Sequence, residues 1–249
     1  MQGEDVWVIE EGFSLAWPAL VEKPMDGWLL KVGGGVSRRS NSANPSVDCQ
    51  PLAQILSTIE LFYRQQHLPT LVRVLSVQAP SFEWVLEQRG YCPEGEARTL
   101  RAQISNGDKA SRTILEFAPS AKWVDDVTSA QQRTTTQKAA YEGHVAKITL
   151  PCAFASTSDD DGEAVSWAYG AIRGKTLFIE SVVTRSDRRG HGHGRDVMRA
   201  LLAWGDANGA ITSVLQVQAE NNAACRLYET LGFREELYRY RYWRAPANA

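Results

Sequence analysis

The sequence predicts an α/β protein made of two tandem units, and three observations support this prediction. The second half of the chain has the predicted order strand, strand, strand, glycine-rich loop, helix, strand, helix, strand. A fainter copy of that order occurs in the first half, offset by 142 residues. The glycine-rich loop stands between a strand and a helix, where the first helical amides have no internal partner.

The elements of the second half follow from residue patterning. Runs rich in apolar and β-branched residues, bounded by turn residues, indicate strands. Apolar residues three and four positions apart indicate helices, one of which starts near Gly194 and stops at Asn208-Gly209. The predicted strands are 151–158, 164–172, 176–184, 211–218 and 236–243. The other predicted helices are 123–131, 135–144 and 222–231, the last capped near Asn221.

The first half repeats part of this pattern but lacks its loop. Residues 85–91 align with 227–233, and the preceding strand and helix follow without a gap. Where the glycine-rich loop should stand, residues 47–52 contain no glycine, and Leu86 takes the place of Tyr228. If these residues do chemistry in the second half, the first half cannot do it in the same way.

The repeat predicts a division of the chain into two units. A degenerate unit is expected over 1–110 and an active unit over 111–249, joined near 107–112. Chance similarity between two αβ units is the alternative interpretation.

Composition indicates a packed protein without a general affinity for polyanions. Of the 249 residues, 43% are hydrophobic and 22% are charged, which excludes disordered and collagen-like chains. The formal charge of −2 gives no pull toward nucleic acid or an anionic membrane. No apolar run reaches the roughly 20 residues that span a bilayer, and the first residues are acidic, so a cytoplasmic location is expected. The four cysteines show no C-x-x-C spacing, which argues against a zinc site and a disulfide framework.

The strongest local signal is the run Arg189-Gly190-His191-Gly192-His193-Gly194-Arg195. Its glycines let the backbone approach a ligand, and the free amides of the following helix favour an anion, most naturally phosphate. No lysine followed by serine or threonine comes after it, which excludes a P-loop, and the glycine spacing differs from the dinucleotide fingerprint. A third pattern, [RQ]-x-x-G-x-[GA], is met by Arg189, Gly192 and Gly194.

Two motifs together resemble the GNAT superfamily of acyl-CoA-dependent N-acyltransferases. Val182-Val183-Thr184 followed by the glycine-rich loop is similar to the pyrophosphate-binding motif of that family. The second motif is Asn221-x-x-Ala224-x-x-Leu227-Tyr228-x-x-Leu231-Gly232-Phe233. The resemblance covers roughly 145–243 and implies a mixed, mostly antiparallel central sheet with flanking helices. It also implies acetyl-CoA as co-substrate, direct attack by a primary amine, and no metal.

The resemblance assigns roles to individual residues. Amides of the loop would hold the CoA pyrophosphate at the helix N-terminus, and the strand before the loop would splay from its neighbour. Tyr228 would protonate the departing thiolate, while Asn221 would contact the pantetheine arm or serve only as a helix cap. Glu180, two residues before Val182 and by strand periodicity on the same face, is a candidate general base. The implied cofactor-binding residues are Val182, Val183, Thr184, Arg189, Gly190, His191, Gly192, His193, Gly194, Arg195, Asn221, Ala224 and Tyr228.

One position departs from a known branch of the family. Ribosomal-protein N-terminal acetyltransferases carry a glutamate base where this chain has Gln216, and an amide cannot serve as that base. A protein α-amine as acceptor is therefore in doubt. The role of the polar stretch 37–42 stays open, between lining the cleft between units and closing a hairpin.

Other functions are weighed against acetyl transfer. A non-catalytic acyl-CoA-binding or sensing protein is the main alternative, and a nucleic-acid-binding module is disfavoured by the net charge. His191 and His193 suggest metal binding only weakly, since no third ligand is near in sequence. The expected partners are acetyl-CoA and an amine-bearing acceptor, without nucleic acid or membrane, for a monomer or weak homodimer.

Overall fold

The computed structural model of the protein describes residues 3–104 and 112–247. The helices are α1 (Gly3–Ala16), α2 (Leu52–Gln65), α3 (Ala79–Gln88), α4 (Ala121–Ala130), α5 (Thr135–Ala146), α6 (His193–Ala207) and α7 (Asn222–Thr230), with short 3-10 helices η1 (Arg39–Asn41) and η2 (Ser186–Arg188). The strands are β1 (Val21–Met25), β2 (Trp28–Val32), β3 (Ala43–Pro45), β4 (Leu71–Leu75), β5 (Cys92–Gln103), β6 (Thr113–Glu116), β7 (Cys152–Ser158), β8 (Ala164–Arg173), β9 (Thr176–Thr184), β10 (Thr212–Gln218) and β11 (Glu235–Arg244). Within these ranges, no helix combines the length and apolarity needed to cross a membrane.

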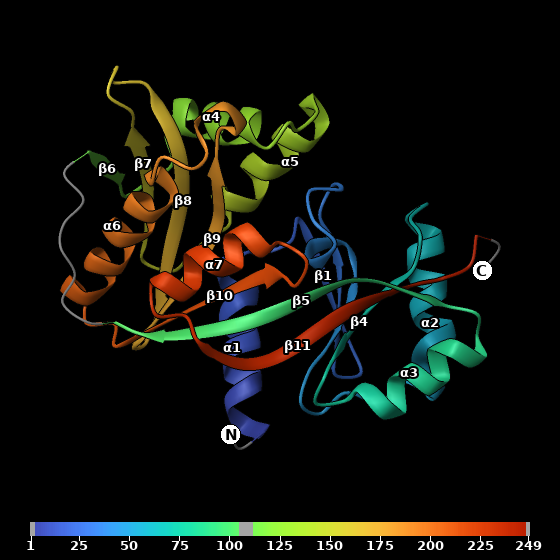
Figure 1. The fold of residues 1–249 in the computed structure, drawn as a ribbon. Helices are drawn as coiled ribbons and strands as arrows, with labels where there is room; N and C mark the ends of the chain where they lie inside the picture. Colours follow the sequence, from blue (N-terminus) through green and yellow to red (C-terminus); the bar gives the residue numbers. More distant parts are fainter. Residues whose placement is uncertain (1–2, 105–111, 248–249) are drawn as a thin grey trace.

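All the strands belong to one sheet, and the predicted fold class is confirmed. The strand order is β1-β2-β3-β4-β11-β5-β10-β9-β8-β7-β6. Among the described residues, β3–β4 and β9–β10 are the parallel pairs, and the other neighbours run antiparallel. In the second half, α6 and α7 pack on one face of the sheet, while α4 and α5 pack on the other (Figure 1).

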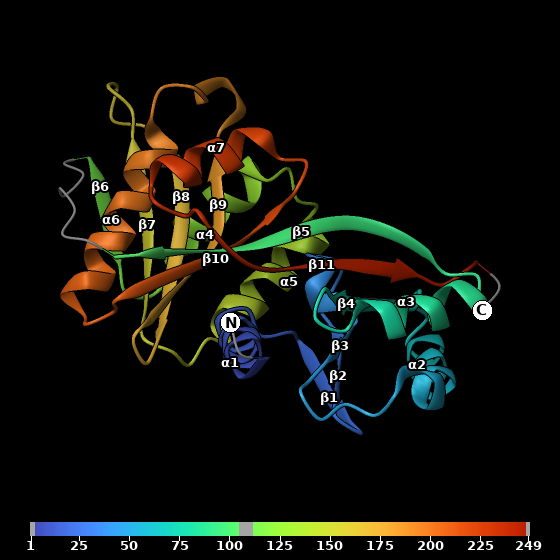
Figure 2. The ribbon, with the colours of Figure 1, turned by 60° about the horizontal axis from the view of Figure 1, so that its bottom comes forward.

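The internal repeat is visible in the element positions. Shifted by 142 residues, α2, β4, α3 and β5 fall on α6, β10, α7 and β11 to within a few residues at each end. The last strands of the two halves are exchanged, because β5 pairs with β10 and β11 pairs with β4. Both long strands therefore run between the halves, side by side (Figure 2).

The register of the exchanged strands obeys the same offset. In the β5–β11 pair, Arg98 lies opposite Arg239 and Ala97 lies opposite Tyr240, and the 142-residue shift converts one pair into the other. The two halves thus exchange their last strands in a nearly symmetric way, with the β5–β11 pair between them. The predicted junction between units lies outside the described residues except for Arg112, so the division at residue 110 stays a prediction.

Helix α1 was not anticipated from the sequence, yet it covers the central face of the sheet. Phe13 packs edge-on against Phe178 of β9 with ring centroids 5.1 Å apart. The hydroxyl of Tyr169, on β8, donates to the carbonyl of Ala16 at 2.7 Å. The N-terminal helix therefore packs on strands of the second half (Figure 1).

Candidate active site

The site is built around a fork between β9 and β10. The two strands pair in parallel from Thr176 opposite Thr212 to Ile179 opposite Leu215. Beyond that point β10 continues beside β5, while β9 continues beside β8. The strand separation that the resemblance implied is therefore present, and it starts at Glu180.

A β-bulge bends β9 away at the start of the fork. Tyr169 lies opposite Glu180 and Trp167 lies opposite Val183, so two residues of β9 face one residue of β8. Ser181, inside the bulge, has a φ of 56°, which side-chain-bearing residues seldom adopt. Glu180 and Val182 do not share a face, contrary to the prediction from strand periodicity, because the extra residue breaks the period of two. Val183 packs with the aromatic core under α4 and α5, whereas Val182 packs under α6 and α7.

The glycine-rich loop connects the end of β9 to α6. Gly190 and Gly192 have φ angles of 83° and 89°, and a Cβ at either position would meet nothing within 4 Å. Within the described chain, the amides of 190–194 donate to no protein acceptor. The loop therefore presents free N–H groups at the N-terminus of a long helix, the arrangement expected of an anion cradle.

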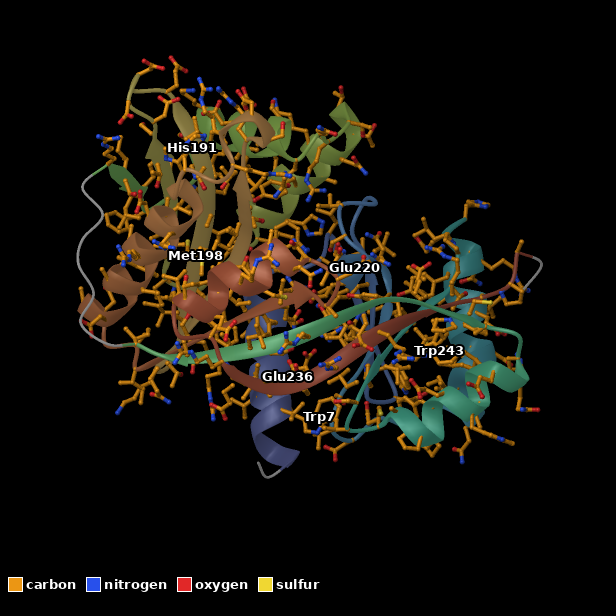
Figure 3. The ribbon with its side chains drawn as sticks, viewed as in Figure 1. Trp7, His191, Met198, Glu220, Glu236 and Trp243 are labelled. Atoms are coloured by element: carbon orange, nitrogen blue, oxygen red, sulfur yellow. The ribbon has the colours of Figure 1, made fainter. Side chains whose placement is uncertain are left out.

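Neighbouring contacts hold the loop in place. Arg188, just before it, donates to Asp159 of the β7–β8 turn at 3.1 Å. A Cβ on Gly194 would lie 3.3 Å from Leu227 and from Thr184, so this glycine lets α6 approach both α7 and β9. In Figure 3, His191 of this loop lies farther from the long strands β5 and β11 than Met198 of α6 does.

The paired histidines give little support to a metal site. The rings of His191 and His193 lie 6.2 Å apart at a tilt of 38°. In the described part of the chain, no group of three or more His, Cys, Asp or Glu side chains is placed to hold a metal ion.

Tyr228 lies on the face of the sheet covered by α6 and α7. Its side chain is buried, in contact with Phe233 and the core beneath the two helices. Its hydroxyl has no hydrogen-bond partner among the described residues. Burial raises the pKa of Tyr228, with smaller contributions from Cys225 and Glu180, so the phenol is protonated at neutral pH. A protonated phenol without a protein partner is available as a proton donor.

Asn221 caps the helix that carries Tyr228. Its side-chain oxygen accepts a hydrogen bond from the amide of Ala224 at 3.1 Å. The alternative of a cap role is therefore confirmed, while the proposed contact with pantetheine stays a prediction.

Glu180 lies on the opposite face, in an ion pair that the sequence did not reveal. Its carboxylate accepts from Arg39 of η1 at 2.7 Å, and the two side chains are only 12% and 13% exposed. Burial raises the pKa of Glu180, and the guanidinium of Arg39 opposes that rise.

Gln216 is part of a hydrogen-bond network behind this pair. Its side-chain oxygen accepts from Arg39 at 2.6 Å and from the Tyr240 hydroxyl at 3.0 Å, and its nitrogen donates to Glu10 of α1 at 3.2 Å. Glu10 is also bound by Arg73. A glutamate at position 216 would place a second carboxylate against Glu10, so this network requires an amide there.

Sequence patterns could not have found this network. Glu10 and Arg39 come from segments with no motif, although the stretch 37–42 is basic and polar. Both roles left open for this stretch are present: it lies in the connection between the antiparallel strands β2 and β3, and its Arg39 contacts Glu180 and Gln216 of the second half. The three tyrosines of β11 at positions 238, 240 and 242 are buried with α1.

The separated strands β9 and β10, the glycine-rich loop before α6 and the helix that carries Tyr228 together are typical of the GNAT class of acetyltransferase. The family profile described as "Probable histone acetyltransferase Rv0428c C-terminal" matches residues 4–243. The chain therefore belongs to this family of GNAT acetyltransferases.

Individual relatives agree with this assignment. The "Uncharacterized N-acetyltransferase YobR" of Bacillus subtilis is 28% identical over 237 residues, covering 92% of this chain and 95% of that protein. A GCN5-related N-acetyltransferase from Kribbella flavida has a similar fold, with a TM-score of 0.66, 16% identity, and coverage of 95% of this chain and 93% of that one. A tandem GNAT protein from the clavulanic acid biosynthesis pathway has a TM-score of 0.64 and 12% identity, covering 82% of this chain and 74% of that one.

Proposed function

We propose that the protein transfers an acetyl group from acetyl-CoA to a primary amine by direct attack. The fork is the observation that carries this proposal. It opens next to the loop with free amides, with Tyr228 on one face of the sheet and Glu180 on the other. A thioester entering the fork would have access to an acid from one side and a base from the other.

The proposed reaction has no covalent enzyme intermediate. Glu180, directly or through water, takes a proton from the ammonium, and the amine nitrogen then forms a bond to the thioester carbonyl carbon. A backbone amide of 182–184 would stabilise the oxyanion. The C–S bond breaks as the Tyr228 phenol gives its proton to the thiolate, which leaves as free CoA. The nitrogen loses its second proton as the amide forms, and this proton restores the Tyr228 phenol through solvent. The products are the amide, CoA and one proton released to solvent.

The proposal assigns different tasks to the two units. The unit over 111–249 would bind acetyl-CoA, and the unit over 1–110 would not, since residues 47–52 provide no glycine loop. The name of the matching family refers to a histone acetyltransferase. A peptide amine is therefore the first acceptor to test, beside a polyamine such as spermidine.

Calorimetric titration with acetyl-CoA tests the cradle. We expect the wild type to bind and Gly192→Glu to lose binding, because the new carboxylate would enter the space proposed for the pyrophosphate. Gly209→Glu is the matched control, since Gly209 lies at the other end of α6 with a φ of 81° and equally open surroundings. Equal loss of binding in both variants would show that backbone strain, and not the cradle, is responsible.

Tyr228→Phe separates catalysis from binding. We expect acetyl-CoA affinity close to that of the wild type and a kcat lower by about 10²–10⁴-fold, the usual contribution of a general acid. Release of CoA thiol in the presence of the peptide or spermidine gives the rate. Binding of acetyl-CoA without turnover by the wild type would favour an acyl-CoA-binding or sensing protein instead.

A further inference from the structure

The degenerate half contributes Arg39 to the fork, where this side chain contacts both strands. The guanidinium of Arg39 donates to Glu180 at 2.7 Å through Nη2 and to Gln216 at 2.6 Å through Nη1. Glu180 and Gln216 are the first residues of β9 and β10 beyond their last parallel pair. Arg39 thus bridges the two strands at the point where their own pairing stops.

We propose that Arg39 is a positioning residue for the acyl transfer: it fixes the width of the fork and holds Glu180 as an oriented carboxylate. This inference rests on the proposed function, and it gives the N-terminal half a direct role in the site. The planar, two-pronged guanidinium suits this task, because each prong binds a different strand.

The segment that carries Arg39 is held rigidly. Asn41 accepts from the amide of Gly33 at 2.9 Å and donates to the carbonyl of Ser37 at 2.7 Å, closing the turn. A Cβ on Gly33 would lie 2.5 Å from the buried Ser40, so the turn also requires glycine at 33. The guanidinium itself lies over the Phe13 ring, 5.5 Å from its centroid. Arg39 therefore cannot leave the fork without disrupting the contact with α1.

Few other charges act on Glu180. Lys31 of β2 is the second cation that lowers its pKa, after Arg39, and burial acts against both. The remaining neighbours are the neutral amide of Gln216 and three phenols, Tyr141, Tyr169 and Tyr228. Without Arg39, Lys31 would be the one remaining cation that opposes the effect of burial on the pKa of Glu180. This pKa would rise, so the carboxylate would take up a proton at a higher pH than in the wild type.

Carbon NMR of the full-length protein labelled at glutamate side-chain carboxyls tests this role directly. The Glu180 signal is identified by its absence in Glu180→Gln and followed from about pH 4 to pH 9. In Arg39→Met we expect its titration midpoint to rise by about one pH unit or more, as loss of a close opposite charge requires. Arg39→Lys should recover part of this shift, since an ammonium restores the charge but not the two-pronged contact.

Arg38→Met is the matched control. Arg38 precedes Arg39 in the same turn and carries the same charge, but it lies 3.7 Å from Glu94 and over the Tyr242 ring. We expect the Glu180 midpoint in this variant to equal that of the wild type. An equal midpoint in Arg39→Met and Arg38→Met would overturn the proposal, and the one-dimensional proton spectrum of each variant establishes that it is folded.

The pH profile of CoA release links this titration to the reaction. With the peptide or spermidine as acceptor, the acid limb of kcat/KM should move in Arg39→Met by the same amount as the Glu180 midpoint. A midpoint that moves while the acid limb stays fixed would contradict the positioning role. If the wild type acetylates neither acceptor, the proposed acetyl transfer to these amines fails, and the NMR titration still decides whether Arg39 holds Glu180 ionised.

Discussion

Lys31 is a buried cation at the contact between β2 and α1. Its side chain is 4% exposed, and its ammonium donates to Ser14 at 2.7 Å and lies 3.5 Å from Glu22. Burial lowers the pKa of Lys31 to about 8, although Glu22 favours the charged form. Keeping this ammonium charged near neutral pH costs on the order of 3 kcal/mol of folding free energy.

The cost predicts a rise of stability with pH. Between about pH 8 and pH 10.5 the unfolded chain still binds the proton that folded Lys31 has released, so the free energy of unfolding should increase across this window. In Lys31→Met the free energy of unfolding should rise less across this pH window, because the contribution from the Lys31 proton is absent. Urea denaturation of both proteins at several pH values measures it, and parallel pH dependences would show that the Lys31 pKa is not lowered.

Helix α1 packs closely against β9 through Gly12. A Cβ built on this glycine would lie 2.0 to 2.7 Å from atoms of the Phe178 ring. A glycine inside an exposed helix lowers helix stability by up to about 1 kcal/mol relative to alanine. The close contact with Phe178 explains why α1 has a glycine at position 12 despite this cost. Its place in the helix lets the backbone of α1 lie directly on the aromatic ring.

Gly12→Ala should therefore destabilise the protein despite the better helix propensity of alanine. We expect a loss of about 1–3 kcal/mol, the range for inserting a methyl group into a packed core. The matched background is Phe178→Leu, in which the smaller side chain should make Gly12→Ala neutral or stabilising. Urea denaturation of the four proteins completes the cycle, and an equal effect in both backgrounds would show that the ring is not the obstacle.

The exchanged strands join the two halves into one sheet. The last strand of the first half completes the second, and the last strand of the second half completes the first. Neither half can open fully without unpairing β5 from β11. This arrangement predicts a single cooperative unfolding unit, unlike tandem domains joined by a linker.

A core substitution in the first half tests this cooperativity. Leu56 of α2 is 1% exposed, and Leu56→Ala should cost about 2–5 kcal/mol. We expect the slowest-exchanging amides of β4 and of β10 to lose the same free energy of protection in hydrogen-exchange measurements. Loss of protection confined to β4 would mean that the halves unfold separately.

Much of the element pattern was predictable from local sequence. The strand predicted over 176–184 is β9 at its observed bounds, and the helix expected from Gly194 starts one residue earlier. These segments have strong periodicity and clear stop signals, which depend only on near neighbours. Helix α1 lacked such signals, and the Ser181 bulge depends on how β8 and β9 pair. For that reason the faces of Glu180 and Val182 were predicted incorrectly.

Local sequence was sufficient to predict the family, and to predict that a glycine-rich loop precedes α6 and that a helix carries Tyr228, because a loop's glycines and a helix's spacing are properties of adjacent residues. Only the tertiary structure decided which strands are exchanged between the halves, and that Arg39 meets Glu180 across 141 residues of chain. Strand partners and buried ion pairs join distant segments that no local pattern connects. Their positions are set by the packing of the complete sheet.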